Sequence, residues 1–361
     1  MTIMSRTYVP DCMKDLSHLN APHRPGLRVL ALDVENEPHK FLICYVIPTV
    51  TLATVAVYVF KRFCWGCPQE KDLVANCLFD KDGKTLCSPV AFQGCDNVVT
   101  LTLAEKHPVT YDTRRFIFDL PSPYHRLGVP IGREVVLVAV TECSCVSRQY
   151  IPINLDHEIG RLEIIVKVYV DDPSKGMPGG QMTQFLDNMK IGDCIDAQGP
   201  SGHLWEYTGR GRLNVFSQTH KITFAKRAKE IGLVAGGAGI TPFLRLIRYC
   251  ETEGQDSPRL SLVFANKSNL DIIERQYLER LSKSNPGKFQ LYMCVDLEPV
   301  EEDWCQGVGR VSCEMIQKYL PEPSLDSFVM VSGPTGFINH SMDLLSHVGY
   351  TENRVLALCS S

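Results

Sequence analysis

Two glycine-rich turns are among the residues of this sequence best suited to chemistry. The first, VAGGAGITPF (234–243), carries Gly236, Gly237 and Gly239 where a buried apolar run becomes an amphipathic one. Glycines let a ligand approach the backbone, and a helix that follows offers free N–H groups and the positive end of its dipole. This pattern favours an anion-binding turn, although glycines needed only for packing would leave the same pattern.

The second turn, VSGPTGF (331–337), repeats the arrangement with Gly333 and Pro334. Two such turns at the carboxyl ends of strands in one parallel sheet predict a ligand crevice. Asp296 ends a third apolar run, CVD, where its carboxylate could accept hydrogen bonds from a ribose diol and repel a 2′-phosphate. A surface carboxylate in a loop is the alternative for Asp296.

A third candidate site combines a glycine pair with an Arg-x-Tyr pair. In GGQMTQFL (179–186) the start of a short helix can hold a diphosphate through backbone N–H groups and the Thr183 hydroxyl, or the helix can plug a barrel, and both can be true. Arg148 and Tyr150 share a strand parity, so they point to one face. Arg can pair with phosphate and a Tyr ring can lie against a planar ligand, but packing alone would also explain the pair.

The elements that must position these residues change in character along the chain. From about residue 98, short alternating runs predict strands of a small antiparallel β-barrel, interrupted by one helix at 183–189. These runs are VVTLTLAEK, RRFIFDL, GREVVLVAV, RLEIIVKVYV and DCIDAQGP.

From about residue 228, strand and helix alternate four times, which indicates a parallel sheet covered by helices. The predicted helices are ITPFLRLIRYCET, DIIERQYLERLSK, CEMIQKYL and FINHSMDLLSHVG. The predicted fold therefore has two domains, an antiparallel β-barrel (98–220) followed by an α/β parallel-sheet domain (228–361).

Composition narrows the class of protein. The chain has 361 residues and a net charge of −4, so it lacks the basic footprint expected of nucleic-acid binding. Its 15 cysteines are an odd number and are scattered, which favours free thiols in a reducing compartment.

Residues 41–60, FLICYVIPTVTLATVAVYVF, contain no charge. A helix of this length spans about 30 Å, the thickness of a bilayer core, so we expect a transmembrane anchor after a tail at 1–40. A buried strand pair is the alternative, since Val and Thr are frequent and Pro48 interrupts. Forty preceding residues argue against a cleaved signal peptide, and flanking basic residues leave the orientation open.

We expect residues 61–97 to form a Cys-rich linker. Cys64 and Cys67 have the spacing of a metal or redox pair, but the second pair that a zinc site needs is missing. A plain linker is the simpler interpretation, and palmitoylation next to the membrane is another.

Taken together, these residues resemble the NADH–cytochrome b5 reductase family, within the ferredoxin-reductase group of flavoproteins, as a divergent member. The resemblance runs from about residue 98 to the C-terminus. It is carried by DTRRFIFDLPSPYHRLGVPIG, IVKVYV, PGGQMTQFLDNMKIGD, GPSG, VAGGAGITPFL, VFANKSNLDII and SGP. The resemblance implies an FAD-binding barrel, an NADH-binding domain and an N-terminal membrane attachment.

The resemblance also implies roles for single residues. Arg148, Tyr150, Ile151 and Pro152 occupy the flavin clamp. Tyr150, Thr241 and Ser332 occupy positions next to the chemistry. The other residues implied to line the FAD site are Val166, Lys167, Tyr169, Gly180, Gln181, Met182 and Thr183. Those implied to contact NADH are Gly236, Gly237, Gly239, Asp296, Gly333 and Pro334.

Departures from the family pattern cluster at the chemistry. The clamp has Ile151 and Asn154 where the family carries hydroxyl side chains. Ala238 replaces a Thr in the glycine turn, and Ser332 replaces a Cys before Gly-Pro. Further departures are Arg133-Glu134 in place of Gln-His, Gln181 in place of Lys, and a C-terminus that reads CSS.

Two hypotheses follow. In the first, the chain is an oxidoreductase that passes electrons from NADH through FAD to a haem acceptor such as cytochrome b5, or to a membrane redox protein. In the second, it is a catalytically weakened subunit with a structural or assembly role in a larger membrane complex. Either endoplasmic reticulum or mitochondrial membrane fits, with the catalytic domain on the cytosolic or matrix side, where soluble NADH is found.

Overall fold

The computed structural model describes residues 89–140, 145–171, 179–202, 204–216, 222–297, 304 and 306–359. The predicted tail, the predicted anchor at 41–60 and the Cys64–Cys67 pair lie outside these residues and stay predictions. Within the described ranges, no helix has both the length and the apolar character needed to cross a bilayer. The same ranges contain no group of three His, Cys, Asp or Glu side chains that could hold a metal ion.

The first domain is built on a six-stranded sheet in which every pairing is antiparallel, in the order β4-β3-β6-β1-β2-β5. Its strands are β1 (Gly94–Thr110), β2 (Thr113–Asp119), β3 (Glu134–Val140), β4 (Cys145–Tyr150), β5 (Arg161–Lys167) and β6 (Cys194–Ser201). Alternate residues of β3 are buried, as the period of two in its sequence predicts. The antiparallel architecture is confirmed. Among the described residues β4 and β5 are edge strands that do not pair with each other.

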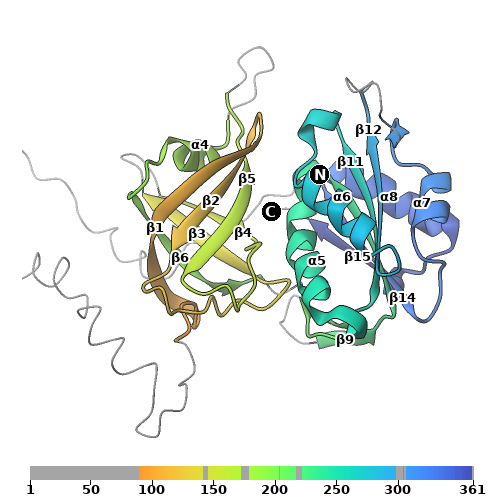
Figure 1. The fold of residues 1–361 in the computed structure, drawn as a ribbon, viewed down its shortest axis with the longest axis horizontal. Helices are drawn as coiled ribbons and strands as arrows, with labels where there is room; N and C mark the ends of the chain where they lie inside the picture. The colour runs from red at the N-terminus through yellow and green to blue at the C-terminus, as the bar shows by residue number, and fades with distance from the viewer. Residues whose placement is uncertain are drawn as a thin grey trace, which may run out of the picture. The chain divides into compact units, whose positions relative to one another are not determined.

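The one helix predicted inside this domain is confirmed as α4 (Gln181–Asn188). Its apolar side, with Met182 and Leu186, packs into the core of the sheet. Figure 1 shows where α4 lies on this domain. The helix therefore closes part of the sheet's hydrophobic interior, whatever else it does.

A three-stranded antiparallel sheet, which was not predicted from the sequence, follows. It consists of β7 (Trp205–Tyr207), β8 (Arg212–Phe216) and β9 (Ile222–Arg227). The turn between β7 and β8 contains Gly209, Arg210 and Gly211, all with positive φ. Gly211 is required there, because a Cβ would lie 2.0 Å from the carbonyl oxygen of Ala228.

The second domain is a six-stranded parallel sheet in the order β13-β12-β11-β10-β14-β15. Its strands are β10 (Glu230–Gly236), β11 (Arg259–Asn266), β12 (Phe289–Val295), β13 (Gly307–Val308), β14 (Ser327–Gly333) and β15 (Val355–Cys359). Its α-helices are α5 (Thr241–Glu253), α6 (Arg275–Ser284), α7 (Cys313–Tyr319) and α8 (Thr335–Val348). Short 3-10 helices occur at Gly237–Ile240, Gly254–Asp256, Asn269–Asp271 and Glu352–Arg354.

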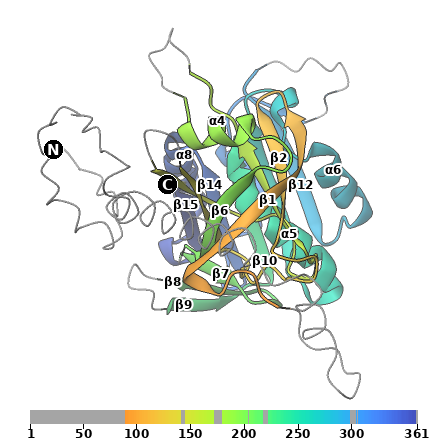
Figure 2. The ribbon, with the colours of Figure 1, turned by 90° about the vertical axis from the view of Figure 1, so that its left-hand side faces the viewer.

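Helices cover both faces of this sheet, as Figures 1 and 2 show. Ile231 and Leu233 of β10 belong to the apolar cluster that includes α5 and α6, whereas Val234 belongs to the cluster that includes α7 and α8. A strand buried on both faces reads as a continuous apolar run, which is why EIGLVAGG predicted a central strand.

Helix α6 begins four residues later than the predicted DIIERQYLERLSK helix. Ile272 is extended, and Glu274 adopts the left-handed conformation at φ 56°. The chain therefore turns at Glu274 before the helix starts at Arg275, and the prediction of one unbroken helix from Asp271 was wrong.

One apolar cluster runs through both domains. Ile131, Ile153 and Ile165 from the first domain share it with Phe243 and Leu244 of α5. The two domains are therefore packed through a common hydrophobic core.

Candidate functional site

The order in which strands are added to the parallel sheet reverses between β10 and β14. Strands β11 and β12 continue on one side of β10, while β14 and β15 lie on the other. The carboxyl ends of two such neighbouring strands border the crevice where ligands bind in open α/β sheets. Both predicted glycine turns lie at this point.

The two glycine turns are in direct contact. A Cβ on Gly239 would lie 2.4 Å from the carbonyl oxygen of Ser332 and 2.6 Å from the Cα of Gly333. A Cβ on Gly236 would lie 2.9 Å from the ring of Phe337. The packing explanation therefore holds for Gly236 and Gly239, whose glycines let the turns meet.

Gly237 has a different environment. Its φ is 53°, and no atom lies within 4 Å of the position a Cβ would occupy. Gly237 begins a short 3-10 helix, Gly237–Ile240, and α5 follows with Pro242 in its first turn. The first backbone N–H groups of a helix have no partner within it, and the Thr241 hydroxyl donates to the Ala238 carbonyl at 3.1 Å. An open, side-chain-free backbone before a helix start fits the phosphates of a dinucleotide.

The ends of β11 and β12 extend this edge. Asp296 is exposed, and its backbone N–H donates to the Asn266 carbonyl at 3.0 Å. The side-chain amide of Asn266 is buried, and neither of its polar atoms has a hydrogen-bond partner among the described residues. Asn266 was not singled out from the sequence, although an Asn ending the strand-like run RLSLVFAN was a visible signal.

The Arg-x-Tyr pair lies at the end of edge strand β4. Burial raises the pKa of the Tyr150 phenol, and the nearby Arg148 charge opposes that rise. Tyr150 packs partly on the core of the sheet, whereas Arg148 is exposed and donates to the Ser147 carbonyl at 2.8 Å. The charge of Arg148 is near enough to act on the Tyr150 phenol, in line with the strand parity that the two residues share.

Three residues predicted to line the FAD site lie at the end of β5 and just after it, and their side chains have different environments. Val166 is only 3 % exposed and packs in the core of the sheet, so its side chain is unavailable to a ligand. Tyr169 is exposed. Lys167 forms an ion pair with Asp112 at 2.8 Å.

Lys167 and Asp112 stabilise each other's charged forms. Burial alone would lower the pKa of Lys167, but the hydrogen bond and the charge of Asp112 raise it. Burial alone would raise the pKa of Asp112, but the hydrogen bond from Lys167 lowers it, helped by the hydroxyls of Thr113 and Thr110. The partner Asp112 was not predicted, because a contact between the β1–β2 turn and the end of β5 has no local sequence signal.

Helix α4 has the packing role that its sequence allowed, and its diphosphate-binding role stays a prediction. Met182 is buried, and the Thr183 hydroxyl is engaged within the chain, donating to the Gly180 carbonyl and accepting from the Tyr169 N–H. A Cβ on Gly180 would lie 2.5 Å from this hydroxyl oxygen. The first N–H groups of a helix have no partner within it, so those of Gln181 and Met182 can serve a diphosphate while the Thr183 hydroxyl fixes the turn.

Two of the departures from the family pattern have structural roles. Asn154 is fully buried; its amide donates to the Arg161 carbonyl and accepts from the Glu163 N–H, both at 2.9 Å. Arg133 pairs with Glu206 at 2.7 Å and so connects the start of β3 to β7. Ile151 is half-buried and Pro152 is buried at the clamp itself.

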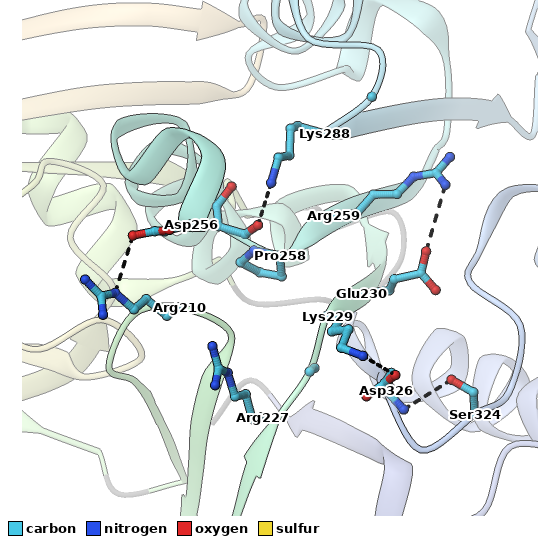
Figure 3. Close-up of a pocket in the computed structure, with 13 residues that line it drawn as sticks. Arg210, Arg227, Lys229, Glu230, Asp256, Pro258, Arg259, Lys288, Ser324 and Asp326 are labelled. Carbon is cyan, nitrogen blue, oxygen red and sulfur yellow. Dashed lines mark hydrogen bonds and ion pairs between the residues drawn. The ribbon is translucent and has the colours of Figure 1, made fainter.

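A cavity of about 540 Å³ lies away from all of these residues, at the amino-terminal edge of the parallel sheet. Figure 3 shows its carboxylates facing cations: Asp256 pairs with Arg210, Asp326 with Lys229 and Glu230 with Arg259. None of the predicted site residues lines it. Its position opposite the glycine turns excludes it as the nucleotide crevice.

Two family models match the chain in the predicted order. Residues 100–207 match an oxidoreductase FAD-binding domain, and residues 233–343 match an oxidoreductase NAD-binding domain. The first match covers β4, β5 and α4, and the second covers both glycine turns.

Relatives of known name agree with these models. The NADH-cytochrome b5 reductase 2 of Homo sapiens is 37% identical over 269 residues, which cover 74% of this chain and 96% of the relative. The NADH-cytochrome b5 reductase 1 of Bos taurus is 38% identical over 247 residues, covering 68% of this chain and 80% of the relative.

Solved structures show the same fold. The cytochrome b5 reductase domain of Ulva prolifera nitrate reductase superposes with a TM-score of 0.67 at 24% identity, covering 74% of this chain and all of that domain. The fold, the two matched domains and the identity to curated relatives lead to one conclusion: this chain is a member of the NADH–cytochrome b5 reductase family of oxidoreductases.

Proposed function

We propose that this chain passes electrons from NADH through FAD to a one-electron acceptor of the cytochrome b5 type. The observation that carries the proposal is the contact between the two glycine turns. They meet where the strand order of the sheet reverses, between β10 and β14, and the first turn leads into the start of α5. The names of the curated relatives supply the acceptor class.

Each side of the site has a share of the binding. Arg148 and the α4 N-terminus hold the phosphates of FAD, and the Tyr150 ring lies against its planar part. Gly237 and the α5 N-terminus hold those of NADH, and Asp296 accepts from its ribose hydroxyls. FAD, when bound, accepts a hydride from NADH and returns its electrons singly. The buried surroundings of Pro152 and Ile153 keep water from one side of the clamp.

A weakened catalyst with an assembly role is the second candidate. Ile151 and Ala238 present only hydrocarbon where the family pattern has hydroxyls, and Ser332 is a hydroxyl in place of a thiol. Each lost hydrogen bond of this kind costs about 0.5–1.5 kcal/mol, so several together can slow hydride transfer while FAD binding persists.

An anaerobic absorbance spectrum of the full-length, FAD-loaded chain, before and after NADH is added, separates the two candidates. We expect the flavin band to bleach within seconds. A flavin spectrum that NADH leaves unchanged would exclude the reductase and favour the assembly role. Cytochrome b5 added to the reduced protein then tests the acceptor, by the appearance of reduced haem.

Anchoring in an endoplasmic reticulum or mitochondrial membrane through residues 41–60 is part of the same proposal. Its support is the charge-free stretch itself. Carbonate extraction of membranes from cells expressing the full chain should leave the protein in the pellet, and a chain lacking residues 1–60 should move to the supernatant. Release of the full chain by carbonate would overturn the anchor.

A further inference from the structure

A buried arginine on α5 has no role in the function described so far. Arg245 is 1 % exposed, and its Nη1 donates to the Pro130 carbonyl at 3.2 Å. Its Nε has no hydrogen-bond partner among the described residues. Burying a guanidinium costs free energy unless it is fully paired, so this position calls for an explanation.

The surrounding carboxylates are engaged elsewhere. Asp156 pairs with Arg126 at 3.2 Å and accepts from the Gly128 N–H at 2.7 Å. Glu158 pairs with Arg248 at 2.9 Å. Within the described part of the chain no carboxylate forms an ion pair with Arg245, and burial lowers its pKa to about 10. The residue remains a cation at neutral pH without a direct counter-ion.

Arg248, three residues further along α5, contacts the flavin clamp and the segment that follows it. Its Nη1 donates to the Ile153 carbonyl at 3.0 Å, and its Nη2 donates to Glu158 at 2.9 Å. Ile153 lies between Pro152 and Asn154 of the predicted clamp. Glu158 is itself held in place, because it accepts from the Leu155 N–H at 2.6 Å.

Helical periodicity places Thr241, Arg245 and Arg248 on one side of α5, at steps of four and three residues. The side of the helix that begins with Thr241 is therefore fixed to the first domain at two points, the carbonyls of Pro130 and Ile153. Both acceptors are backbone atoms, so the contacts report the position of the chain itself and not of a flexible side chain.

We propose that Arg245 and Arg248 are positioning residues that fix the start of α5, with Thr241, against the flavin clamp. This inference rests on the proposed function, because it assigns the two guanidinium groups the task of keeping the NADH side and the FAD side of the site in register. A misplacement of about 1 Å can slow a hydride-type transfer by about a hundredfold, so rigid contacts at this junction matter more for rate than for folding.

The test uses Arg245→Met and Arg248→Gln in the full-length, FAD-loaded protein. Rapid-mixing kinetics give the flavin reduction rate at saturating NADH and the NADH dissociation constant, and denaturant unfolding gives the stability. Arg245→Met should unfold at an equal or higher denaturant concentration, because an unpaired buried charge is removed. Both variants should reduce their flavin at least tenfold more slowly, with bound FAD unchanged.

Arg259→Gln is the matched control. It removes an exposed ion pair from the same domain, at the opposite edge of the sheet, and should leave the reduction rate unchanged. Arg248→Lys keeps the charge opposite Glu158 but not both hydrogen bonds, so its reduction rate should lie between those of the wild type and Arg248→Gln. If Arg245→Met fails to fold, the reduction rates of the two Arg248 variants still test the positioning role.

Hydrogen exchange on the FAD-free protein supplies a readout that needs no turnover. Arg248→Gln should speed exchange in 148–154 and in 238–244 together, while Arg259→Gln should change neither. Unchanged exchange in both segments, or unchanged reduction rates in both arginine variants, would overturn the positioning role. If NADH does not reduce the flavin of the wild type, the proposed function is overturned instead. The exchange result would then still test whether Arg248 couples the flavin clamp to the start of α5.

Discussion

The two edges of the parallel sheet differ in packing, and the edge with the large cavity is not the one that carries the nucleotide motifs. The carboxyl-terminal edge has two glycine turns packed so closely that a single methyl group would collide with backbone. The amino-terminal edge has the cavity of about 540 Å³, lined by charged side chains that are mostly exposed and paired with each other. The tightly packed edge is the one that carries the motifs matched to a nucleotide.

The difference favours chain topology, and not the size of a hollow, as the guide to where this fold should bind a ligand. At the carboxyl edge, strand ends, helix starts and side-chain-free turns converge at the reversal between β10 and β14. At the amino edge the backbone donors are already used, since Lys229 and Glu230 both donate to the Asp326 carbonyl. Substitutions at the two edges should therefore have unequal effects.

The largest effect is expected from Gly239→Ala. The added Cβ would meet the backbone of Ser332 at 2.4 Å, so the two turns must separate, which costs about 1–3 kcal/mol of unfolding free energy. Reduction by NADH should fall by more than tenfold. Gly287→Ala, at the amino edge where no atom lies within 4 Å, is the control for denaturant unfolding and for flavin reduction. Equal effects of the two substitutions would contradict the comparison.

A smaller effect, confined to cofactor choice, is expected from Asp296→Ser. Loss of a carboxylate that accepts from a ribose should weaken NADH binding by about tenfold and relax the exclusion of NADPH. The ratio of flavin reduction rates with NADH and NADPH, measured at low cofactor concentration, checks this. Asp256→Ser at the amino edge should leave that ratio unchanged; a fall in stability with no change in the ratio would remove Asp296 from the site.

Two ion pairs of equal length allow a comparison by pH. Lys167–Asp112 and Lys229–Asp326 both measure 2.8 Å, but the side chains are 29% and 18% exposed in the first pair and 76% and 54% in the second. The folded-state pKa of Asp112 is lowered, so its stabilisation is present above its unfolded pKa and is lost as the pH falls through the folded value. The pKa of Lys167 is raised, so its share is present below its unfolded pKa and is lost as the pH rises through the folded value.

Asp112→Asn should therefore lower the unfolding free energy by about 1 kcal/mol between roughly pH 5 and 9, with the difference shrinking below about pH 4. Denaturant unfolding of both proteins across this range measures it. A difference that grows as the pH falls would contradict the assigned sign.

The smallest effect is expected from Lys229→Gln. An exposed ion pair contributes about 0–1 kcal/mol, and salt screens it. Stability should change by less than about 0.5 kcal/mol and flavin reduction by nothing measurable. A clear loss of reduction rate would mean that the amino edge is coupled to the nucleotide crevice, and would contradict the expected difference between the two edges.

The sequence predicted the order of the two domains, since its hydrophobic period changes from two to the alternation of strands and helices. It did not predict β7, β8 and β9, because their runs are short and the positive φ of Arg210 in their turn is not apparent from residue type. It placed the start of α6 too early, because nothing in DIIER marks Glu274 as left-handed. Local patterns thus indicated the long elements and missed the turns that depend on tertiary contacts.

In the candidate site, too, local motifs were predicted and features that depend on tertiary contacts were missed. The glycine turns were found from motifs, and the structure brings them into contact. Side-chain direction was harder to predict: Val166 points into the core, and Asn154 supports a loop from a fully buried position. Asp112 and Arg248 were missed because their partners, Lys167 and Ile153, are far from them along the chain.

The apolar cluster that joins Ile131, Ile153 and Ile165 to Phe243 and Leu244 has a consequence for how the protein is assembled. Neither domain can bury its own share of that cluster alone, so the two should melt together as one cooperative unit, with a single heat-absorption peak in calorimetry. The α/β half must therefore emerge from the ribosome before the barrel half reaches its full stability. A single peak would make the two domains halves of one folding unit, whereas two peaks would make them separate modules.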